Sequence, residues 1–600
     1  MSDLVDRRQP AELGLLFRSA AALSVWVPLV VTLFRTSAVT AWRDDLGVIR
    51  SLSLAPIGGE GLVSAILGRA LGLLPLGGVW LRVGLVGAVA AAAAGGLAFF
   101  LVVRLLGVSR RRSAMTPLLA LGAALLAVLG AAWQEEATLA GGGALGAVLC
   151  LLCLQAGSSR GLSPVAWGAS GVALSLALVE SRSAGLAGLV AWGAARLAIA
   201  RLPSPASLAV FAAAAVAAAF LVVLPFAVRT GSEVLSAPFA VQASSAGAWH
   251  GLEGSAGPVA FDWPLLVAAA AGLALALAAL SRSSRPLSLG LCCWVLGSLA
   301  VSEGPAGALL PWPGRTWLLL GAVASVAGFA FSIDRVAAWL LRARLPFARP
   351  ALALTASLGF AAVIVTWETS GRDADRSRRD AAELWTDEAL QSLPPSSVVI
   401  ARSPSIAFRL WGAALARGAR PDLVVVPTAL LDSASLASDL LALEPALGPL
   451  VRQMAVHGKP TEYALSSLAD ARPLFVEFDP SWDPRLFDHL IPEAFWLRFA
   501  PHALGRSDRV EALKGVRTAF RRVARRALDP AHADAATLQV LYRRGREQAL
   551  ALAALGDRSN AHLVLGDLRK FDGARPFVDA LATRLDARSR GRVDISDLLD

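Results

Sequence analysis

Long apolar stretches separated by short polar loops fill the first 367 residues of this 600-residue chain. A helix that crosses a bilayer needs about 20 predominantly apolar residues. The chain is 56% hydrophobic and 17% charged, whereas about a quarter of the residues in a soluble domain are charged. We therefore expect a polytopic α-helical membrane protein with about eleven spanning helices, at residues 14–34, 79–103, 115–133, 138–157, 163–179, 183–200, 207–228, 263–280, 286–302, 316–333 and 350–367.

Two of these stretches are rich in alanine and glycine, at residues 90–96 and 212–219. Small residues let neighbouring helix backbones approach closely, so we expect both to pack inside the helix bundle. The stretch 62–74 is different, because it is too short to span a bilayer, contains Arg69 and has proline and glycine on both sides. It is predicted to be an amphipathic helix at the membrane interface.

Arginines are distributed unevenly among the loops. Arg7 and Arg8 precede the first apolar stretch, and nearly every second loop after it carries further arginines, while the loops between carry carboxylates. Arginine-rich loops tend to remain on the cytoplasmic side. The pattern predicts a cytoplasmic N-terminus, and an odd number of spans then places residues 368–600 on the outer side, with the carboxylate-bearing loops.

Residues 368–600 have the composition of a soluble protein. Short β-type runs at 397–401, 423–427 and 473–478 alternate with helical patterns at about 405–418 and 429–452. This alternation predicts a small α/β domain with a parallel sheet. Helical patterns at 507–527, 534–555, 558–570 and 575–587 follow. We therefore expect three regions: a transmembrane domain at 1–367, an α/β domain at 368–505 and a helical region at 506–600.

Several functional classes find little support in the sequence. The net charge of +11 comes largely with loop arginines and forms no basic stripe with interleaved aromatics, so nucleic-acid binding is not expected. The four cysteines lie within apolar stretches and are interpreted as buried thiols. The sequence contains no P-loop, GxSxG or HExxH motif. A transporter would place charges within its spans, and such charges are few here.

The first outward loop carries the adjacent carboxylates Asp44 and Asp45. Carboxylates at a membrane surface rarely serve packing alone. Two neighbouring carboxylates repel each other, so one of them is expected to have a raised pKa and a greater basicity. The alternative is a solvated pair at a helix N-terminus. Further along, Glu180 and Arg182 are expected to pair with each other inside the bundle.

Several motifs follow one another in an order that is known from one family. They are Asp45-Leu46-Gly47-Val48, Leu73-Leu74-Pro75-Leu76-Gly77, Arg82-Val83-Gly84 and Trp133-Gln134-Glu135-Glu136, and, in the C-terminal region, Leu393-Pro394-Pro395 and Arg420-Pro421-Asp422-Leu423. In this order the chain resembles the bacterial relatives of protein O-mannosyltransferases, which are polyprenol-dependent glycosyltransferases of the GT-C class. Val48 replaces a family glutamate, and 55–59 replace a His-Pro-Pro-Gly-Tyr loop.

The resemblance implies a GT-C-like fold in a bacterial inner membrane with a periplasmic C-terminal domain. It implies transfer of a sugar, mannose in that family, from a polyprenyl-phosphate donor to a protein or glycan acceptor. Asp45 would be the catalytic base, with Asp44 as its neighbour or substitute, and Glu136 a second catalytic acid group. No cofactor is required, and a divalent metal is compatible with the acidic residues. Substrate contacts are expected from Arg43, Arg82, Trp133, Gln134 and Glu135.

Two other interpretations are compatible with the sequence. The departures at Val48 and at 55–59 leave open a catalytically degenerate membrane scaffold whose outer domain binds partners or glycans. A transporter or channel is the third reading. For single residues, Glu136 as a solvated helix end and Arg82 as an interfacial side chain are the alternatives to a role in the reaction.

Overall fold

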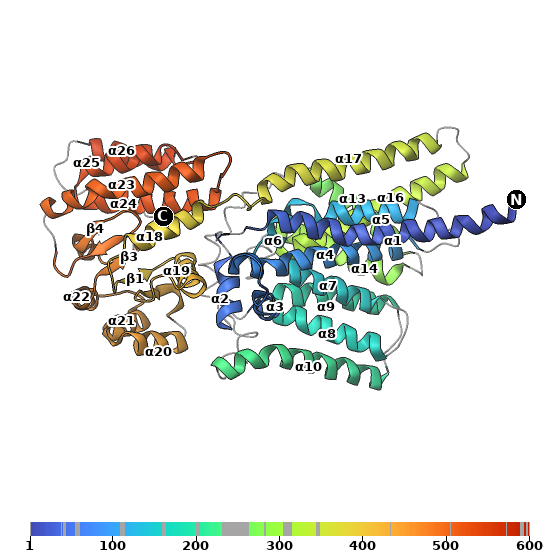
Figure 1. The fold of residues 1–600 in the computed structure, drawn as a ribbon, viewed down its shortest axis with the longest axis horizontal. Helices are drawn as coiled ribbons and strands as arrows, with labels where there is room; N and C mark the ends of the chain where they lie inside the picture. The colour runs from blue at the N-terminus through green and yellow to red at the C-terminus, as the bar shows by residue number, and fades with distance from the viewer. Residues whose placement is uncertain are drawn as a thin grey trace. The chain divides into compact units, whose positions relative to one another are not determined.

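The computed structural model describes residues 2–37, 39, 42, 44–54, 60–107, 115–158, 164–199, 204–230, 263–280, 284–303, 315–343, 348–431, 434–479, 481–503, 506–571, 573–587, 593, 595 and 598. Backbone contacts divide these residues into two compact units (Figure 1). The helical unit contains the described residues up to 37, those from Leu46 to Thr230 and those from Trp263 to Ser377. The C-terminal unit contains the described residues of Val39–Asp45 and the chain from Arg378 onward.

A helix lies at each of the eleven apolar stretches. The helices of this unit are α1 (Ser2–Arg35), α2 (Asp45–Ser53), α3 (Leu62–Gly72), α4 (Val79–Leu106), α5 (Met115–Val128), α6 (Ala131–Ala137), α7 (Ala144–Gly157), α8 (Pro164–Glu180), α9 (Arg182–Ile199), α10 (Pro205–Thr230), α13 (Trp263–Ala278), α14 (Arg285–Glu303), α16 (Arg315–Arg342) and α17 (Ala348–Ala374). The interfacial helix predicted at 62–74 is α3, so its helical character is confirmed.

The expected count of about eleven spans is not confirmed by helix length and composition. Within the described residues, four helices are long and apolar enough to cross a membrane, or five if α5 and α6, bent by 63° at their junction, form one span. Glycines shorten the helices at two of the predicted stretches. The predicted stretch 115–133 breaks before Gly130, which caps α6, and α7 begins only after the three glycines at 141–143. With 14 residues, α7 is about 21 Å long, shorter than a hydrocarbon core of about 30 Å.

Glycine allows close contact between helices in the bundle. A Cβ atom on Gly95 of α4 would lie 2.0 Å from the Ser24 carbonyl oxygen of α1, and one on Gly87 2.0 Å from the Ala137 carbonyl oxygen. Most of the stretch 90–96 is buried, as predicted. The stretch 212–219 is not: α10 is largely exposed, because it lies at the edge of the bundle.

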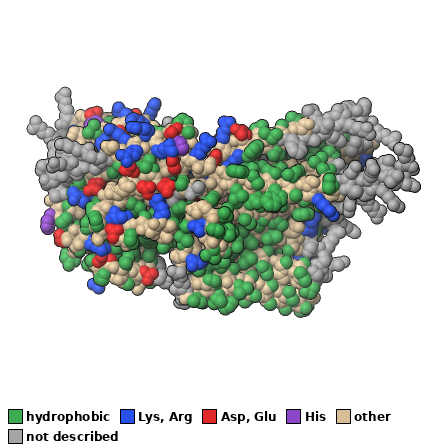
Figure 2. Space-filling view, in the orientation of Figure 1, with side chains coloured by type: hydrophobic (Ala, Val, Ile, Leu, Met, Phe, Trp, Pro, Cys, Tyr) green, Lys and Arg blue, Asp and Glu red, His purple; other side chains and the backbone are tan. Residues whose placement is uncertain are grey.

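The surface of the helical unit is strongly apolar. Figure 2 shows hydrophobic side chains over much of its visible face, whereas charged side chains gather on the C-terminal unit. On α10, Val216, Phe220 and Leu221 are 69%, 61% and 68% exposed. Exposed apolar area on this scale marks a membrane or interaction surface. Together with the long apolar helices, it identifies this unit as the membrane-embedded part of the protein.

The C-terminal unit contains a five-stranded sheet in the order β2-β1-β3-β5-β4. The central strand β1 (Val398–Ala401) pairs in parallel with β2 (Val424–Pro427) and β3 (Leu474–Val476), as predicted. The antiparallel strands β4 (Leu490–Pro492) and β5 (Leu497–Phe499) were not predicted, because three residues are too few to show a period. The surrounding helices are α18 (Ala381–Gln391), α19 (Pro404–Arg417), α20 (Ala434–Leu443), α21 (Gly448–His457) and α22 (Glu462–Ala471).

The single helix expected at 429–452 is two helices. It is interrupted at Pro445, which begins a short 3₁₀ turn between α20 and α21. Proline lacks the N–H that a continuous helix needs. The four C-terminal helices are confirmed as α23 (Arg506–Leu528), α24 (Ala535–Ala554), α25 (Arg558–Leu568) and α26 (Arg575–Asp586). One hydrophobic core includes the sheet and these helices.

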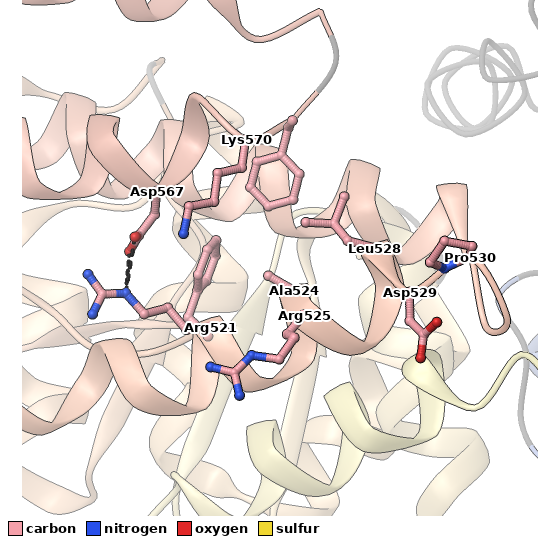
Figure 3. Close-up of a pocket in the computed structure, with 10 residues that line it drawn as sticks. Arg521, Ala524, Arg525, Leu528, Asp529, Pro530, Asp567 and Lys570 are labelled. Carbon is pink, nitrogen blue, oxygen red and sulfur yellow. Dashed lines mark hydrogen bonds and ion pairs between the residues drawn. The ribbon is translucent and has the colours of Figure 1, made fainter.

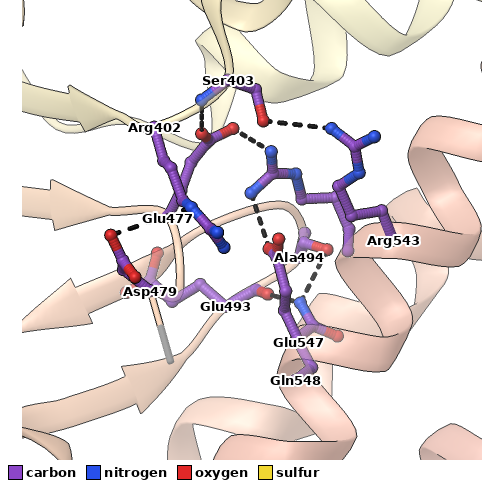
Figure 4. Close-up of polar contacts among 10 residues, drawn as sticks. Arg402, Ser403, Glu477, Asp479, Glu493, Ala494, Arg543, Glu547 and Gln548 are labelled. Carbon is purple, nitrogen blue, oxygen red and sulfur yellow. Dashed lines mark hydrogen bonds and ion pairs between the residues drawn. The ribbon is translucent and has the colours of Figure 1, made fainter. Parts of the chain in front are cut away.

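A buried polar network joins the sheet to α24 (Figure 4). Glu477, which follows β3, accepts a hydrogen bond from the Ser403 N–H and pairs with Arg544 of α24. Arg544 also pairs with Glu547 at 2.7 Å. In α/β sheets this edge, at the carboxyl ends of parallel strands, commonly binds ligands. Here the chain's own arginine occupies it, so the network serves to fasten α24 to the sheet.

Candidate functional site

The Glu136 carboxylate is held between two helix ends in the helical unit. Its Oε2 accepts a hydrogen bond from the Gly143 N–H at 2.8 Å, at the N-terminus of α7. Its Oε1 lies 2.6 Å from the guanidinium of Arg315, the first residue of α16. A helix N-terminus favours a negative charge, which explains the position of the carboxylate. Glu136 is 7% exposed and Arg315 is 22% exposed, so solvent reaches the pair from the arginine side.

A second carboxylate, Glu180, ends α8 and caps α3. It accepts hydrogen bonds from the Ser64 N–H at 2.9 Å and from the Ser64 hydroxyl at 2.5 Å. Its backbone carbonyl accepts one from the Gly61 N–H at 2.7 Å. The expected partner was Arg182, yet the contacts described for the Glu180 side chain are with the N-terminal turn of α3.

A buried arginine, Arg50 of α2, faces Glu60 and Glu180. Gly61 has a φ of 74°, and a Cβ there would lie 2.7 Å from an Arg50 guanidinium nitrogen. Glycine at 61 therefore makes room for the guanidinium. Burial lowers the pKa of Arg50 to about 10, against the opposing effect of the two glutamates. The side chain is thus still a cation at neutral pH.

The two carboxylates lie on either side of the first turn of α7. A Cβ on Gly143 would be 3.5 Å from Glu136 Oε2 and 3.8 Å from Thr316 Oγ1. A Cβ on Gly146 would be 3.8 Å from Glu180 Cγ and 3.9 Å from the same Thr316 oxygen. These distances place Glu136 and Glu180 near the same turn, and each glutamate has an arginine nearby. We name the five residues the acid–arginine cluster: Arg50, Glu60, Glu136, Glu180 and Arg315. Figure 1 shows α2, α3 and α6 at one end of the bundle.

The first-loop carboxylates belong to the C-terminal unit. Both oxygens of Asp45 accept hydrogen bonds from Nη1 of Arg409 in α19, at 3.0 and 3.1 Å. Asp44 is also buried. The pKa of Asp45 is raised to about 6, as the sequence suggested, but the main cause is burial; Arg409 opposes this effect and Asp44 adds to it.

The residues expected to contact substrate have other partners in the structure. Trp133 is fully buried, and its indole N–H donates to the Leu319 carbonyl at 2.9 Å. Gln134 donates to the Leu129 carbonyl, and Arg82 to the Gly72 and Leu74 carbonyls at 2.7 and 3.2 Å. In the structure these three side chains contact backbone carbonyls of turns and helices, and their predicted role toward substrate stays a prediction. Glu135 is half-buried, and Arg43 lies outside the described residues.

Two members of the acid–arginine cluster, Arg50 and Arg315, were not predicted from the sequence. A signal for them exists in the chain. The predicted topology places both in outward loops, where carboxylates predominate and arginine is the exception. An arginine on the outer side therefore needs another explanation, and here each one faces glutamate.

Among the described residues, no group of three or more His, Cys, Asp or Glu side chains comes close enough to hold a metal ion. Glu136 and Asp45 are each paired with an arginine, and Glu180 with Ser64. No step proposed below uses a metal.

A pocket of about 510 Å³ lies in the C-terminal unit, between α23 and α25 (Figure 3). Charged side chains, among them Arg521, Asp567 and Lys570, line it together with Phe520 and Phe571. None of the residues predicted for catalysis or substrate binding lines this pocket.

Comparisons with known proteins find remote structural likeness. No protein-family model matches the chain, and no curated protein matches it. The crystal structure of ArnT from Cupriavidus metallidurans bound to undecaprenyl phosphate is similar with a TM-score of 0.42 and 17% identity, over 77% of this chain and 92% of that one. The apo form gives 0.39 and 15%, over 73% and 95%.

An oligosaccharyltransferase from Archaeoglobus fulgidus, in complex with Zn and sulfate, is similar with a TM-score of 0.38 and 14% identity. This likeness covers 69% of the present chain and 62% of the archaeal one.

Proposed function

We propose that this protein is an integral-membrane glycosyltransferase of the GT-C type. It would move a sugar from a polyprenyl-phosphate donor to a hydroxyl of a protein or glycan acceptor, on the periplasmic side of a bacterial inner membrane. The observation that carries the proposal is the acid–arginine cluster at one end of an apolar helix bundle. Ionisable groups in such a position are expensive to maintain and mark functional sites by default.

Arg315 is the residue that we assign to the donor phosphate. Guanidinium forks suit phosphate oxygens, and Arg315 is the more exposed partner of its pair with Glu136. Glu136 would hold the guanidinium in place before the lipid arrives. Arg50 is buried and would add a second positive charge to the cluster without contacting the phosphate.

The reaction requires one bond to form and one to break. The acceptor oxygen attacks the anomeric carbon, the bond from this carbon to the phosphate oxygen breaks, and the polyprenyl phosphate leaves with the electron pair. A carboxylate takes the proton of the acceptor hydroxyl. Following the family resemblance, we assign this role to Asp45, whose pKa of about 6 suits a base that works near neutral pH. Mannose is the first sugar to test.

The test is transfer of labelled sugar from polyprenyl-phosphate donors by purified protein in lipid. We expect Arg315→Met and Asp45→Asn to abolish most transfer, and Glu136→Gln to weaken it. Matched controls are Arg372→Met and Glu368→Gln, because these two residues form an exposed pair on α17, 78% and 59% exposed. Controls that lose as much transfer as the cluster variants would contradict the assignment.

One observation favours a second function, that of a catalytically degenerate scaffold. Asp45 is only 4% exposed and both of its oxygens contact Arg409, so an acceptor reaches it only by displacing part of that contact. A scaffold would use the pair for stability alone. Wild-type protein that transfers no sugar from any common donor, while remaining folded, would support this second function.

A further inference from the structure

Three described residues of the first loop, Trp42, Asp44 and Asp45, belong to the C-terminal unit and are called the first-loop segment. Trp42 is 4% exposed, and its ring lies 5.1 Å from that of Trp385. Its indole N–H donates to the Thr537 hydroxyl at 2.8 Å, and this hydroxyl donates to Asp534 at 2.6 Å. An aromatic side chain with its polar atom satisfied in this way is firmly placed. The loop that carries Asp45 is thus anchored three residues before it.

Arg409 contacts this segment at two points and α18 of the same unit at a third. One guanidinium nitrogen bonds both Asp45 oxygens, and Cζ lies 4.8 Å from the centre of the Trp42 ring, in cation–π contact. Its Nε donates to the Thr386 hydroxyl at 2.8 Å. Arg409 is 1% exposed, so its orientation is fixed by these contacts. It can therefore fix the orientation of the carboxylate in turn.

The charge on Asp45 depends on this arginine. Burial disfavours the ionised carboxylate, and the neighbouring Asp44 adds to that effect. Arg409 is the one positive group among the causes that act on it. A base has to be ionised before it accepts a proton. Removal of the guanidinium would leave a buried, protonated and inactive acid at neutral pH.

We propose that Arg409 is a positioning residue for the transfer reaction: it orients the Asp45 carboxylate and keeps it ionised. The inference rests on the proposed function and extends it. It assigns to a residue of the C-terminal unit the orientation and the charge of the catalytic base. Neither the resemblance nor the first-loop motif points to a residue of α19.

The experiment compares pH profiles of transfer by the full-length protein. We expect Arg409→Met to lose at least about tenfold of the wild-type rate at pH 6.5 and to recover much of it by pH 9, since a shift of one pKa unit changes the ionised fraction about tenfold. Arg409→Lys keeps the charge, so the rise of its transfer rate on the acid side of the pH profile should stay close to that of wild type. The KM for the donor should change little in either variant.

A second variant covers failure of Arg409→Met to fold. Thr386→Val keeps both charges and nearly the same shape, but removes the hydroxyl that accepts from Arg409 Nε. It should move the acid limb in the same direction by a smaller amount. A loss of rate that is equal at every pH, in either variant, would overturn the proposal and assign Arg409 a structural role.

A measurement without transfer separates this proposal from the proposed function. The melting temperatures of Asp45→Asn, Arg409→Met and the double variant form a cycle. We expect the double variant to melt above Arg409→Met, because asparagine does not need a compensating cation. Wild-type protein without transfer activity would overturn both proposals. Coupling in the cycle would then show that the pair exists and is structural.

Discussion

The Asp45–Arg409 pair of the C-terminal unit and the Glu136–Arg315 pair of the helical unit are made of the same groups at similar distances. They differ in exposure: Arg409 is 1% exposed, while Arg315 is 22% exposed. Thr386 and Trp42 also hold Arg409 in place. A closed pair can set the state of its carboxylate, whereas an open pair presents its arginine to a ligand. Burial of the cation therefore separates a positioning role from a binding role.

The largest effect is expected where the closed pair is broken. Measured at pH 9, where Asp45 is ionised without its partner, Arg409→Met should lower the free energy of unfolding by about 3–5 kcal/mol. A denaturant titration of the detergent-solubilised protein measures this. The exposed-pair variant Arg372→Met should lose about 0–1 kcal/mol. Equal losses in the two variants would remove the contrast between closed and exposed pairs.

The closed pair should also make stability depend on pH. The pKa of Asp45 is raised from 3.8 to about 6 in the folded protein, so the folded state binds more protons than the unfolded state between these values. Stability therefore falls as the pH rises from about 4 to 6, by up to about 3 kcal/mol. The difference in unfolding free energy between wild type and Asp45→Asn, measured across this window, isolates the effect. A difference that is constant with pH would argue against burial of an ionised Asp45.

The open pair should respond in binding. Arg315→Met should raise the KM for the polyprenyl-phosphate donor about 10- to 100-fold, the loss of a charged hydrogen bond worth about 1.5–3 kcal/mol. Its effect on unfolding should be smaller than that of Arg409→Met, because solvent already reaches Arg315. Arg315→Lys keeps the charge but lacks the forked guanidinium, so its KM should lie between those of wild type and Arg315→Met. An unchanged KM in Arg315→Met would move the donor phosphate elsewhere.

Two neighbouring glycines, Gly142 and Gly143, test how the Glu136 side of the open pair is held. A Cβ on Gly142 would lie 2.1 Å from the Glu136 carbonyl oxygen, whereas the nearest atom to a Cβ on Gly143 is 3.5 Å away. Gly142→Ala should therefore displace Glu136 and cost about 1–3 kcal/mol of stability, with reduced transfer. Gly143→Ala should be tolerated in both measurements. Similar melting temperatures for the two variants would mean that the turn at 141–143 yields easily.

The positions of the helices could be predicted from the sequence because long apolar runs leave few alternatives. Their lengths could not, because glycine at 130 and at 141–143 stops a helix without changing the hydropathy of the stretch. The strands β1, β2 and β3 were visible as apolar runs between helices. The strands β4 and β5 have three residues each, which is below the length at which alternation can be read.

The candidate site was only partly visible in the sequence. Asp45 and Glu136 could be predicted as functional residues because they are carboxylates in apolar surroundings. Their partners could not be inferred, since Arg409 is 364 residues away from Asp45 and Arg315 is 179 away from Glu136, and no local pattern links positions so distant. Trp133 was also singled out beside the carboxylates; the structure shows it buried in the bundle, and its predicted substrate contact stays a prediction.

The burial of Trp42 in a unit that otherwise begins at Arg378 has a consequence for biosynthesis. Chains grow at about 5–20 residues per second, so the segment would leave the ribosome about 20–70 s before the sequence around Arg409 that receives it. During this interval the Trp42 ring has no native partner at 385 or 537. The nascent protein thus carries an indole without its native partners, beside two acids, at least until the sequence around Arg409 has been made, and this interval gives a chaperone time to bind it.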